Sequence, residues 1–379
     1  MTTFSGEFME HRPHNLLWNN GTLGERIEAV HERLLRAIPQ VDRVACVLYD
    51  PGTDLLKTFV SSTRHGTPID GYEFKLAESR SLSQLADSGE CRVIDDIPGT
   101  VRPDSTHSKW LLEQGYRSSF TVPMHDRGEF IGLLFFNATA PAAFSAQAQR
   151  DALLHGNLMT MTIAAEKDVA RSILQSVQMI GEVARQRDFE AGPHLDRIAH
   201  YSRLMALLVA DSYGLSDEKI EHIFLFAPLH DIGKVGISER ILQKPGPLDE
   251  DERRVMQKHV RLGTELATKV LDKLKARGLS DSATLLNIIS GHHEMMDGSG
   301  YPAGLAGDQI PVEARIVAVA DVFDALTSQR PYKDPWPVAA AVVELRRMVD
   351  AGKLDAKCVH ALEASVDKIA AIRRRYPDA

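Results

Sequence analysis

An apolar run that ends in an adjacent His and Asp constrains this chain more than any other stretch. The run covers residues 225–229 and leads directly into His230, Asp231 and, after Ile-Gly, Lys234. A carboxylate and an ammonium in apolar surroundings are costly unless another charge compensates them. Imidazole and carboxylate ligands together suit a divalent ion such as Zn, Fe or Mn. The alternative is a helix end, where His230 caps carbonyl groups and Asp231 pairs with Lys234.

The composition is that of a globular protein with two or three domains. The chain has 379 residues, 44% of them hydrophobic, and a net charge of −8, which argues against nucleic-acid binding and against attraction to an anionic membrane. Its 3 cysteines are far apart and predict neither a disulfide framework nor a metal knuckle. No apolar run approaches the ~20 residues that span a bilayer. We therefore expect a cytoplasmic protein without membrane insertion.

The hydrophobic pattern predicts two domains joined by a long helix. After a tail at 1–20, a helix at 23–38 precedes strands and short helices up to residue 137, with a loop at 96–108 and a short helix from Lys109. Strands are expected at 41–49, 55–61, 92–94, 118–124 and 130–137, and a helix at 81–88. This order predicts an α+β domain at 21–165, with helices on an antiparallel sheet. A linking helix at about 144–187 leads into an all-α domain at 166–379. In this domain we expect one helix at 355–375. Pro228 should kink the helix just before His230.

The linking helix carries a narrow apolar stripe. Its members are Val169, Ile173, Val177, Ile180 and Ala184. Such spacing is typical of a seam between two helices, which predicts a homodimer. The alternative is that the stripe packs on the protein's own domains.

Further His and acidic residues of the second half are candidate metal ligands. They are Glu190, His194, His259, the pair His292-His293, and Asp321. Asp321 follows an apolar helical segment, where a carboxylate needs a partner. Each of the others taken alone could be a helix cap or a solvated residue.

The end of the first domain, YRSSFTVPMHDRGEFIGLLFFNA, resembles a GAF domain, and the order of elements over 21–165 agrees. The resemblance implies a sensor of an unidentified small molecule that also supports dimerisation. Cys46 and Cys91 could hold a chromophore or react with an oxidant, although buried structural cysteine is the commoner case.

The order of motifs in the second half resembles the HD-GYP family of cyclic di-GMP phosphodiesterases. HDIGKVGI, KHVRLG, GHHEMMDGSGYP and ADVFDALTSQRPYK follow one another between about 185 and 335. The family implies an all-helical domain with two or three divalent metal ions, Fe or Mn. Position by position, the resemblance makes metal ligands of His230, Asp231, His259, His292, His293 and Asp321, with Asp231 bridging two ions. Glu190 and His194 match the extra ligands of members with three ions.

The resemblance also implies substrate contacts. Lys234 matches a lysine that reaches a substrate phosphate, Arg330 and Lys333 match a basic motif that grips the dinucleotide, and Tyr301 belongs to the Gly-Tyr-Pro tripeptide. We expect a signal-transduction enzyme that converts cyclic di-GMP to pGpG or GMP, with Asp231 and Lys234 as catalytic residues. Two alternatives stay open: a phosphohydrolase for cyclic GMP-AMP, and a non-catalytic receptor of cyclic di-GMP.

Overall fold

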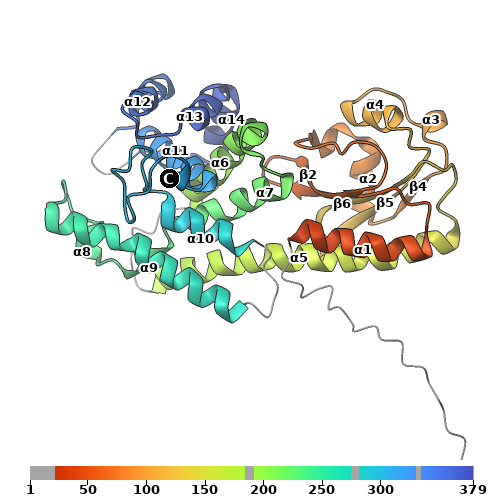
Figure 1. The fold of residues 1–379 in the computed structure, drawn as a ribbon, viewed down its shortest axis with the longest axis horizontal. Coiled ribbons are helices and arrows are strands. Elements are labelled where there is room, and N and C mark those ends of the chain that lie inside the picture. Colours follow the sequence, from red (N-terminus) through yellow and green to blue (C-terminus); the bar gives the residue numbers. More distant parts are fainter. Residues whose placement is uncertain (1–21, 184–191, 275–280, 330–333, 379) are drawn as a thin grey trace, which may run out of the picture.

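The computed structural model describes residues 22–183, 192–274, 281–329 and 334–378. Within them the chain forms a sheet domain and a helical domain that share one long helix, α5 (Ala146–Val183) (Figure 1). This arrangement confirms the expected α+β domain followed by an all-α domain. The expected linking helix ran to 187, and its last four residues lie outside the described ranges.

The sheet domain is built on six antiparallel strands in the order β3-β2-β1-β6-β5-β4. The strands are β1 (Arg43–Asp50), β2 (Leu55–Thr63), β3 (Glu73–Lys75), β4 (Arg92–Ile94), β5 (Ser118–Asp126) and β6 (Glu129–Ala138). Alternate residues of β1 point to opposite faces, as in any strand. Val44, Cys46 and Leu48 therefore join the core under α1 (Leu23–Ala37) and α5, whereas Val47 and Tyr49 pack on the other side.

Helices cover both faces of this sheet. Helices α1 and α5 lie along one face, and α2 (Arg80–Ser88), α3 (Ile97–Thr100) and α4 (Thr106–Glu113) lie over the other (Figure 1). The expectation of a loop at 96–108 and a helix from Lys109 was wrong. Helix α4 begins at Thr106, three residues before Lys109. Ser105 caps it by accepting a hydrogen bond from the Ser108 N–H, which is the usual role of an N-cap serine.

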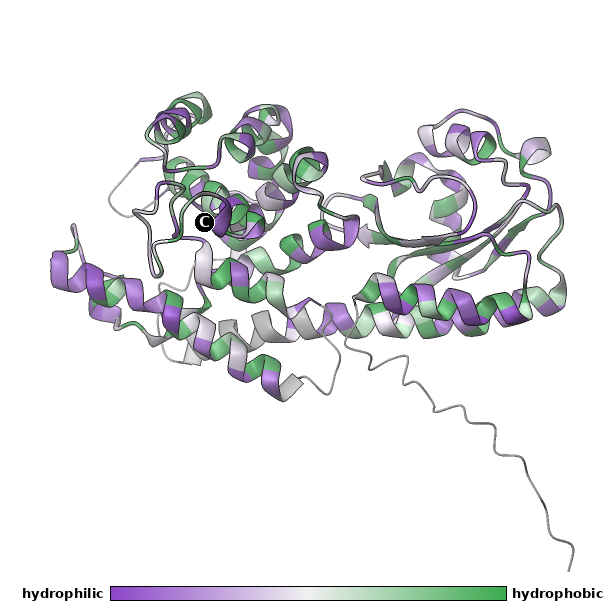
Figure 2. Cartoon of the chain, viewed as in Figure 1, coloured by the Kyte–Doolittle hydropathy of each residue, from purple (hydrophilic) through white to green (hydrophobic). Residues whose placement is uncertain are grey.

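The helical domain surrounds one apolar core that includes Tyr201, Phe226 and Phe323. Its helices are α6 (Gly192–Tyr213), α7 (Asp217–Phe226), α8 (Glu239–Leu242), α9 (Glu250–Leu274), α10 (Ser282–Gly291), α11 (Val312–Thr327), α12 (Val338–Asp350), α13 (Ala356–Glu363) and α14 (Val366–Arg375). Apolar residues are frequent in α10 at the interior, whereas the start of α9 is mostly hydrophilic (Figure 2). A kinked helix was expected to run through Pro228 to Leu229. Instead α7 ends at Phe226, and a single 3₁₀ turn at Ala227–Leu229 leads to His230.

The expected single helix at 355–375 is instead two helices, α13 and α14. The break lies at Ala364 and Ser365, where the Ser365 hydroxyl donates to the Ala361 carbonyl. Serine side chains compete with the helical hydrogen-bond pattern in this way. Among the described helices, none is long and apolar enough to cross a membrane.

Candidate metal centre

Two groups of potential ligand atoms meet in the helical domain. Asp231, His259, His292 and His293 form the first group, and His194, His230 and Asp321 form the second. Within each group the ligand atoms all lie within 4.8 Å of one another. The residues come from α6, α9, α11, the end of α10 and the turn after α7, so the fold joins segments that are far apart in the sequence.

The Asp231 carboxylate faces both groups. Its Oδ1 lies 3.0 Å from His259 Nε2 and 3.6 Å from His292 Nε2, and its Oδ2 lies 3.2 Å from His230 Nε2. One carboxylate therefore presents one oxygen to each side, which is the geometry that a bridging ligand of two ions needs.

Backbone carbonyls fix the tautomers of three histidines. Nδ1 of His230 lies 2.9 Å from the Ala227 carbonyl, Nδ1 of His259 lies 2.8 Å from the Met256 carbonyl, and Nδ1 of His292 lies 3.1 Å from the Ile288 carbonyl. A carbonyl oxygen can only accept, so Nδ1 must carry the proton and donate it. The inferred tautomer therefore leaves Nε2 unprotonated, with its lone pair available to a metal ion. This is the outer-shell arrangement of metal-binding histidines.

The resulting cluster needs a cation. Asp231 Oδ1, His259 Nε2 and His292 Nε2 are buried and make no hydrogen bond within the described part of the chain. Each is an acceptor facing another acceptor, which is unfavourable in a buried site. A divalent ion between them would satisfy all three, so the residues present fit a metal site.

The electrostatic environment keeps the donors in the forms that bind metals. Burial alone would raise the pKa of Asp231, but Lys234 and His230 hold the pKa well below its usual range. Burial and the neighbouring His292 lower the pKa of His293 well below its usual value. An ionised carboxylate and a neutral imidazole are the required ligand forms.

Two glycines allow the backbone to approach the ligands closely. A Cβ atom on Gly233 would lie 1.9 Å from the His259 carbonyl oxygen, where the turn Ile232–Gly236 packs on α9. A Cβ atom on Gly300 would lie 2.5 Å from the His293 carbonyl oxygen. The Tyr301 ring consequently stacks on the His293 ring, with 4.6 Å between the centroids.

Two acidic residues that the sequence did not single out support the ligands. The Asp324 carboxylate accepts from Arg197 and lies 2.6 Å from His194 Nδ1. The buried Glu294 accepts from the backbone N–H groups of Ala303 and Leu305, at 2.7 and 2.9 Å, and so anchors the loop after the His pair. Asp324 is three residues after Asp321 on α11, which was the one signal for it in the sequence.

The remaining predicted site residues have different outcomes. Lys234 Nζ lies 2.7 Å from Asp231 Oδ2, so the ion pair of the alternative interpretation exists inside the ligand cluster. Glu190, Arg330 and Lys333 lie outside the described residues.

The sequence matches two families of known domains. Residues 158–358 match the HD domain, and residues 26–155 match the GAF domain. The response regulator RpfG of Xanthomonas campestris, named as a cyclic di-GMP phosphodiesterase, is 42% identical over 201 residues, which are 53% of this chain and 50% of that protein.

Two further relatives match over similar lengths. The 3'3'-cGAMP-specific phosphodiesterase 2 of Vibrio cholerae is 40% identical over 59% of this chain and 39% of its own length. A cyclic di-GMP phosphodiesterase of Thermotoga maritima is 38% identical over 50% of this chain and 47% of its own length. This chain thus spans half or less of the length of these curated relatives.

Proposed function

The chain belongs to the HD domain family, and from that premise we propose that it is a metal-dependent phosphodiesterase of the HD-GYP type. Its proposed reaction converts cyclic di-GMP to pGpG or GMP, under the control of the N-terminal GAF domain. The observation that carries the proposal is the Asp231 carboxylate, which presents one oxygen to each of two ligand groups.

The chain's own residues hold and orient the reacting groups. Asp231, His259, His292 and His293 would hold one ion, and His230, Asp321 and the second oxygen of Asp231 another, with His194 beside this second group. Two such ions, when bound, lower the pKa of water and polarise a phosphate. Lys234, beside Asp231, would offset negative charge that develops on phosphoryl oxygens. Tyr301 offers a ring face beside the cluster, and Arg330 and Lys333 are proposed to hold the second phosphate and the guanine.

We propose two or three divalent ions of Fe or Mn. Glu190 and His194 are the proposed extra ligands of a third ion. Elemental analysis of anaerobically prepared protein should then give more than two metals per chain, and Glu190→Ala should lower that number towards two. Saturation of the wild-type protein at two metals would exclude the third site.

The test of the function is nucleotide turnover. Purified protein loaded with Mn or Fe should convert cyclic di-GMP to pGpG or GMP, and Asp231→Ala should abolish the conversion because it removes the shared ligand. Asp251→Ala, which removes an exposed carboxylate from α9, serves as the control and should retain full activity. Full activity of Asp231→Ala, measured by chromatography of the products, would overturn the mechanism.

A second candidate substrate is 3'3'-cyclic GMP-AMP, because a relative 40% identical is named for that nucleotide. Turnover of both nucleotides by the same preparation decides between them. Binding of cyclic di-GMP without any turnover by the metal-loaded protein would instead favour a receptor.

We further propose a cytoplasmic homodimer. All three cysteines, Cys46, Cys91 and Cys358, are free thiols, as in a reducing compartment. Helix α5 exposes Leu154 and Met161, 60% and 62% accessible, and Ala165. The spacing of these residues continues into the predicted stripe that starts at Val169, whose side chain lies outside the described residues.

A further inference from the structure

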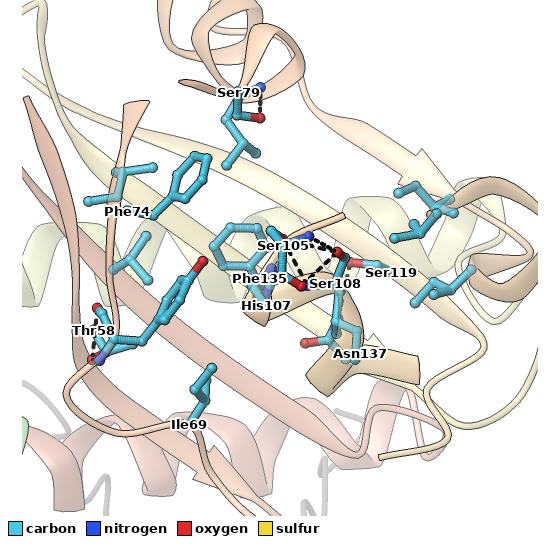
Figure 3. A pocket seen from close by; sticks show the side chains of 18 of the residues that line it. Thr58, Ile69, Phe74, Ser79, Ser105, His107, Ser108, Ser119, Phe135 and Asn137 are labelled. Carbon is cyan, nitrogen blue, oxygen red and sulfur yellow. Dashed lines mark hydrogen bonds between the residues drawn. The ribbon is translucent and has the colours of Figure 1, made fainter. Parts of the chain in front are cut away.

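The sheet domain contains a cavity that lies far along the chain from the metal ligands. It has a volume of about 200 Å³ and lies between the sheet and α4, with walls from β1, β2 and β6. Sites for drug-sized ligands typically measure ~300–1,000 Å³, so this cavity suits a compact molecule. His107 and Phe135 lie near its centre, beside Ser108, Ser119 and Asn137, and Phe74 lies on another side (Figure 3).

The charged groups of the cavity are all cationic. Arg43 and Arg92 line it, and no Asp or Glu is found among the described residues of its wall. Burial lowers the pKa of His107 to about 4, and the two nearby arginines act in the same direction. The imidazole is therefore neutral near pH 7, and the net charge of the wall is positive.

Within the described part of the chain, Arg43 is held in place without a counter-ion. Its Nη1 donates to Asn137 Oδ1 at 3.1 Å, and its guanidinium carbon lies 4.7 Å from the centre of the Trp110 ring. The side chain is 3% exposed, and its Nε has no hydrogen-bond partner among the residues that the structure describes. The charge of Asp70 acts on Arg43, but the two residues form no ion pair.

Arg92 likewise lacks a counter-ion among the described residues. It donates to the hydroxyl groups of Ser81 and Thr121, and its Nε is buried without a partner in the described part of the chain. Burying a cation without an anion is costly, and burial indeed lowers the pKa of Arg43 to about 10. An anion from solution would relieve this cost at both side chains.

The rest of the wall combines apolar and aromatic side chains with the hydroxyl groups of Ser105, Ser108 and Ser119. Leu56, Phe74, Leu111 and Phe135 line it, and His107 stacks between Tyr72 and Trp110. Such a wall favours a ligand whose body is apolar. A guanidinium binds a carboxylate through two parallel N–H groups, for which the Nε of Arg43 is available.

We propose that this cavity binds a compact monocarboxylate with an apolar body, held by Arg43 and favoured by the charge of Arg92. This proposal depends on the proposed sensor role of the GAF domain only where ligand binding is to change the rate of hydrolysis. The binding itself is independent of the metal site, so its test uses binding and not turnover.

The experiment is isothermal titration calorimetry of the full chain with three probes: benzoate, phenylacetate and 4-methylpentanoate. At least one of them should bind, and the matching neutral amide should bind at least about tenfold more weakly, because a charge-assisted hydrogen bond is lost. Arg43→Gln should weaken the carboxylate by a similar factor. Arg102→Gln removes the same charge from an exposed position of the same domain and should leave the affinity unchanged.

Arg92→Gln provides a second variant, in case Arg43→Gln fails to fold. It should also weaken carboxylate binding while the amide is unaffected. Equal affinity for carboxylate and amide, unchanged affinity in both arginine variants, or no binding of any probe up to about 10 mM would overturn the proposal. None of these outcomes depends on phosphodiesterase activity, so they leave the proposed reaction untouched.

Discussion

His194 Nδ1 lies 2.6 Å from Asp324 Oδ2, although 130 positions of the sequence separate the two residues. The same carboxylate accepts two hydrogen bonds from Arg197. Burial alone would raise the pKa of Asp324, but the hydrogen bonds of His194 and Arg197 lower it to about 2. An ionised Asp324 orients the His194 ring, so that Nε2 points to the group containing His230 and Asp321.

Asp324→Asn should therefore weaken metal binding without removing a ligand. The expected loss of affinity for the second group is about 10- to 100-fold, which is typical of outer-shell partners. Titration of metal into protein that a chelator has stripped of metal measures this affinity. Glu265→Gln, which removes an exposed carboxylate on α9, is the control and should bind metal normally. Unchanged metal affinity in Asp324→Asn would show that the contact serves folding alone.

Gly233→Ala should displace His259. The added methyl group would lie 1.9 Å from the His259 carbonyl and 2.4 Å from the Gly263 nitrogen, and neither backbone atom can rotate away. Overpacking typically costs ~1–3 kcal/mol, and here the strain falls on the turn after Asp231. We expect lower stability in urea and a reduced metal content.

The control for Gly233→Ala is Gly156→Ala in α5. There the added Cβ would lie 3.5 Å from Leu134 and Phe136, an ordinary contact distance. Because Ala is the better helix former, this variant should gain roughly 0.5–1 kcal/mol. A Gly233→Ala protein as stable and as metal-rich as wild type would contradict the close approach.

His222 predicts a dependence of stability on pH. Its ring is fully buried between Glu166 and Asp281, with Phe226 stacked on it. Lys219 contacts Asp281, and Arg26 contacts Glu166. Burial lowers the pKa of His222, but the contacts with Asp281 and Glu166 outweigh this and raise it to about 9.

A raised pKa means that the charged imidazole stabilises the fold. The contribution is complete below the ordinary value of 6.5 and is lost as the pH rises through about 9. The shift corresponds to at most roughly 3 kcal/mol. Urea unfolding at several pH values should show this loss in wild type but not in His222→Gln. The exposed His360→Gln should behave like wild type, and equal slopes for wild type and His222→Gln would refute the assignment.

Local patterns predicted much of the fold, whereas the proposed ligand set came from the order of motifs that resembles the HD-GYP family. Strands such as β5 and β6 follow from apolar runs around a turn, and a break in the helical pattern before His230 follows from Pro228. The partner of His194 could not be read from the sequence, because the contact joins two helices far apart in the chain. From the sequence alone, Arg43 is only a charged residue at the start of a predicted strand. Only the pairing of Arg43 with Asn137 across β1 and β6 places it inside a cavity.

An exposed apolar face of α5, which includes Leu154 and Met161 and continues into the predicted stripe, should hold two copies of the chain together. Leu154 and Met161 are seven residues apart on one face of the helix and are more than half exposed. The same helix contacts the turn Ile232–Gly236, which follows Asp231. A dimer seam on α5 would thus join the sheet domain to the metal site through one rigid element, which is a physical requirement for coupling between the two.

Met161→Glu combined with Leu154→Lys should dissociate the dimer and change the basal phosphodiesterase activity. Charged groups in the seam would lose their hydration on pairing, which the burial of apolar area could not offset. Light scattering at micromolar concentration measures the mass. Leu208→Lys, at a 54% exposed apolar position on α6 outside the stripe, is the matched control and should leave a dimer. If the double variant stays dimeric, or if the wild-type protein is a monomer, α5 is a tether between the domains and carries no seam.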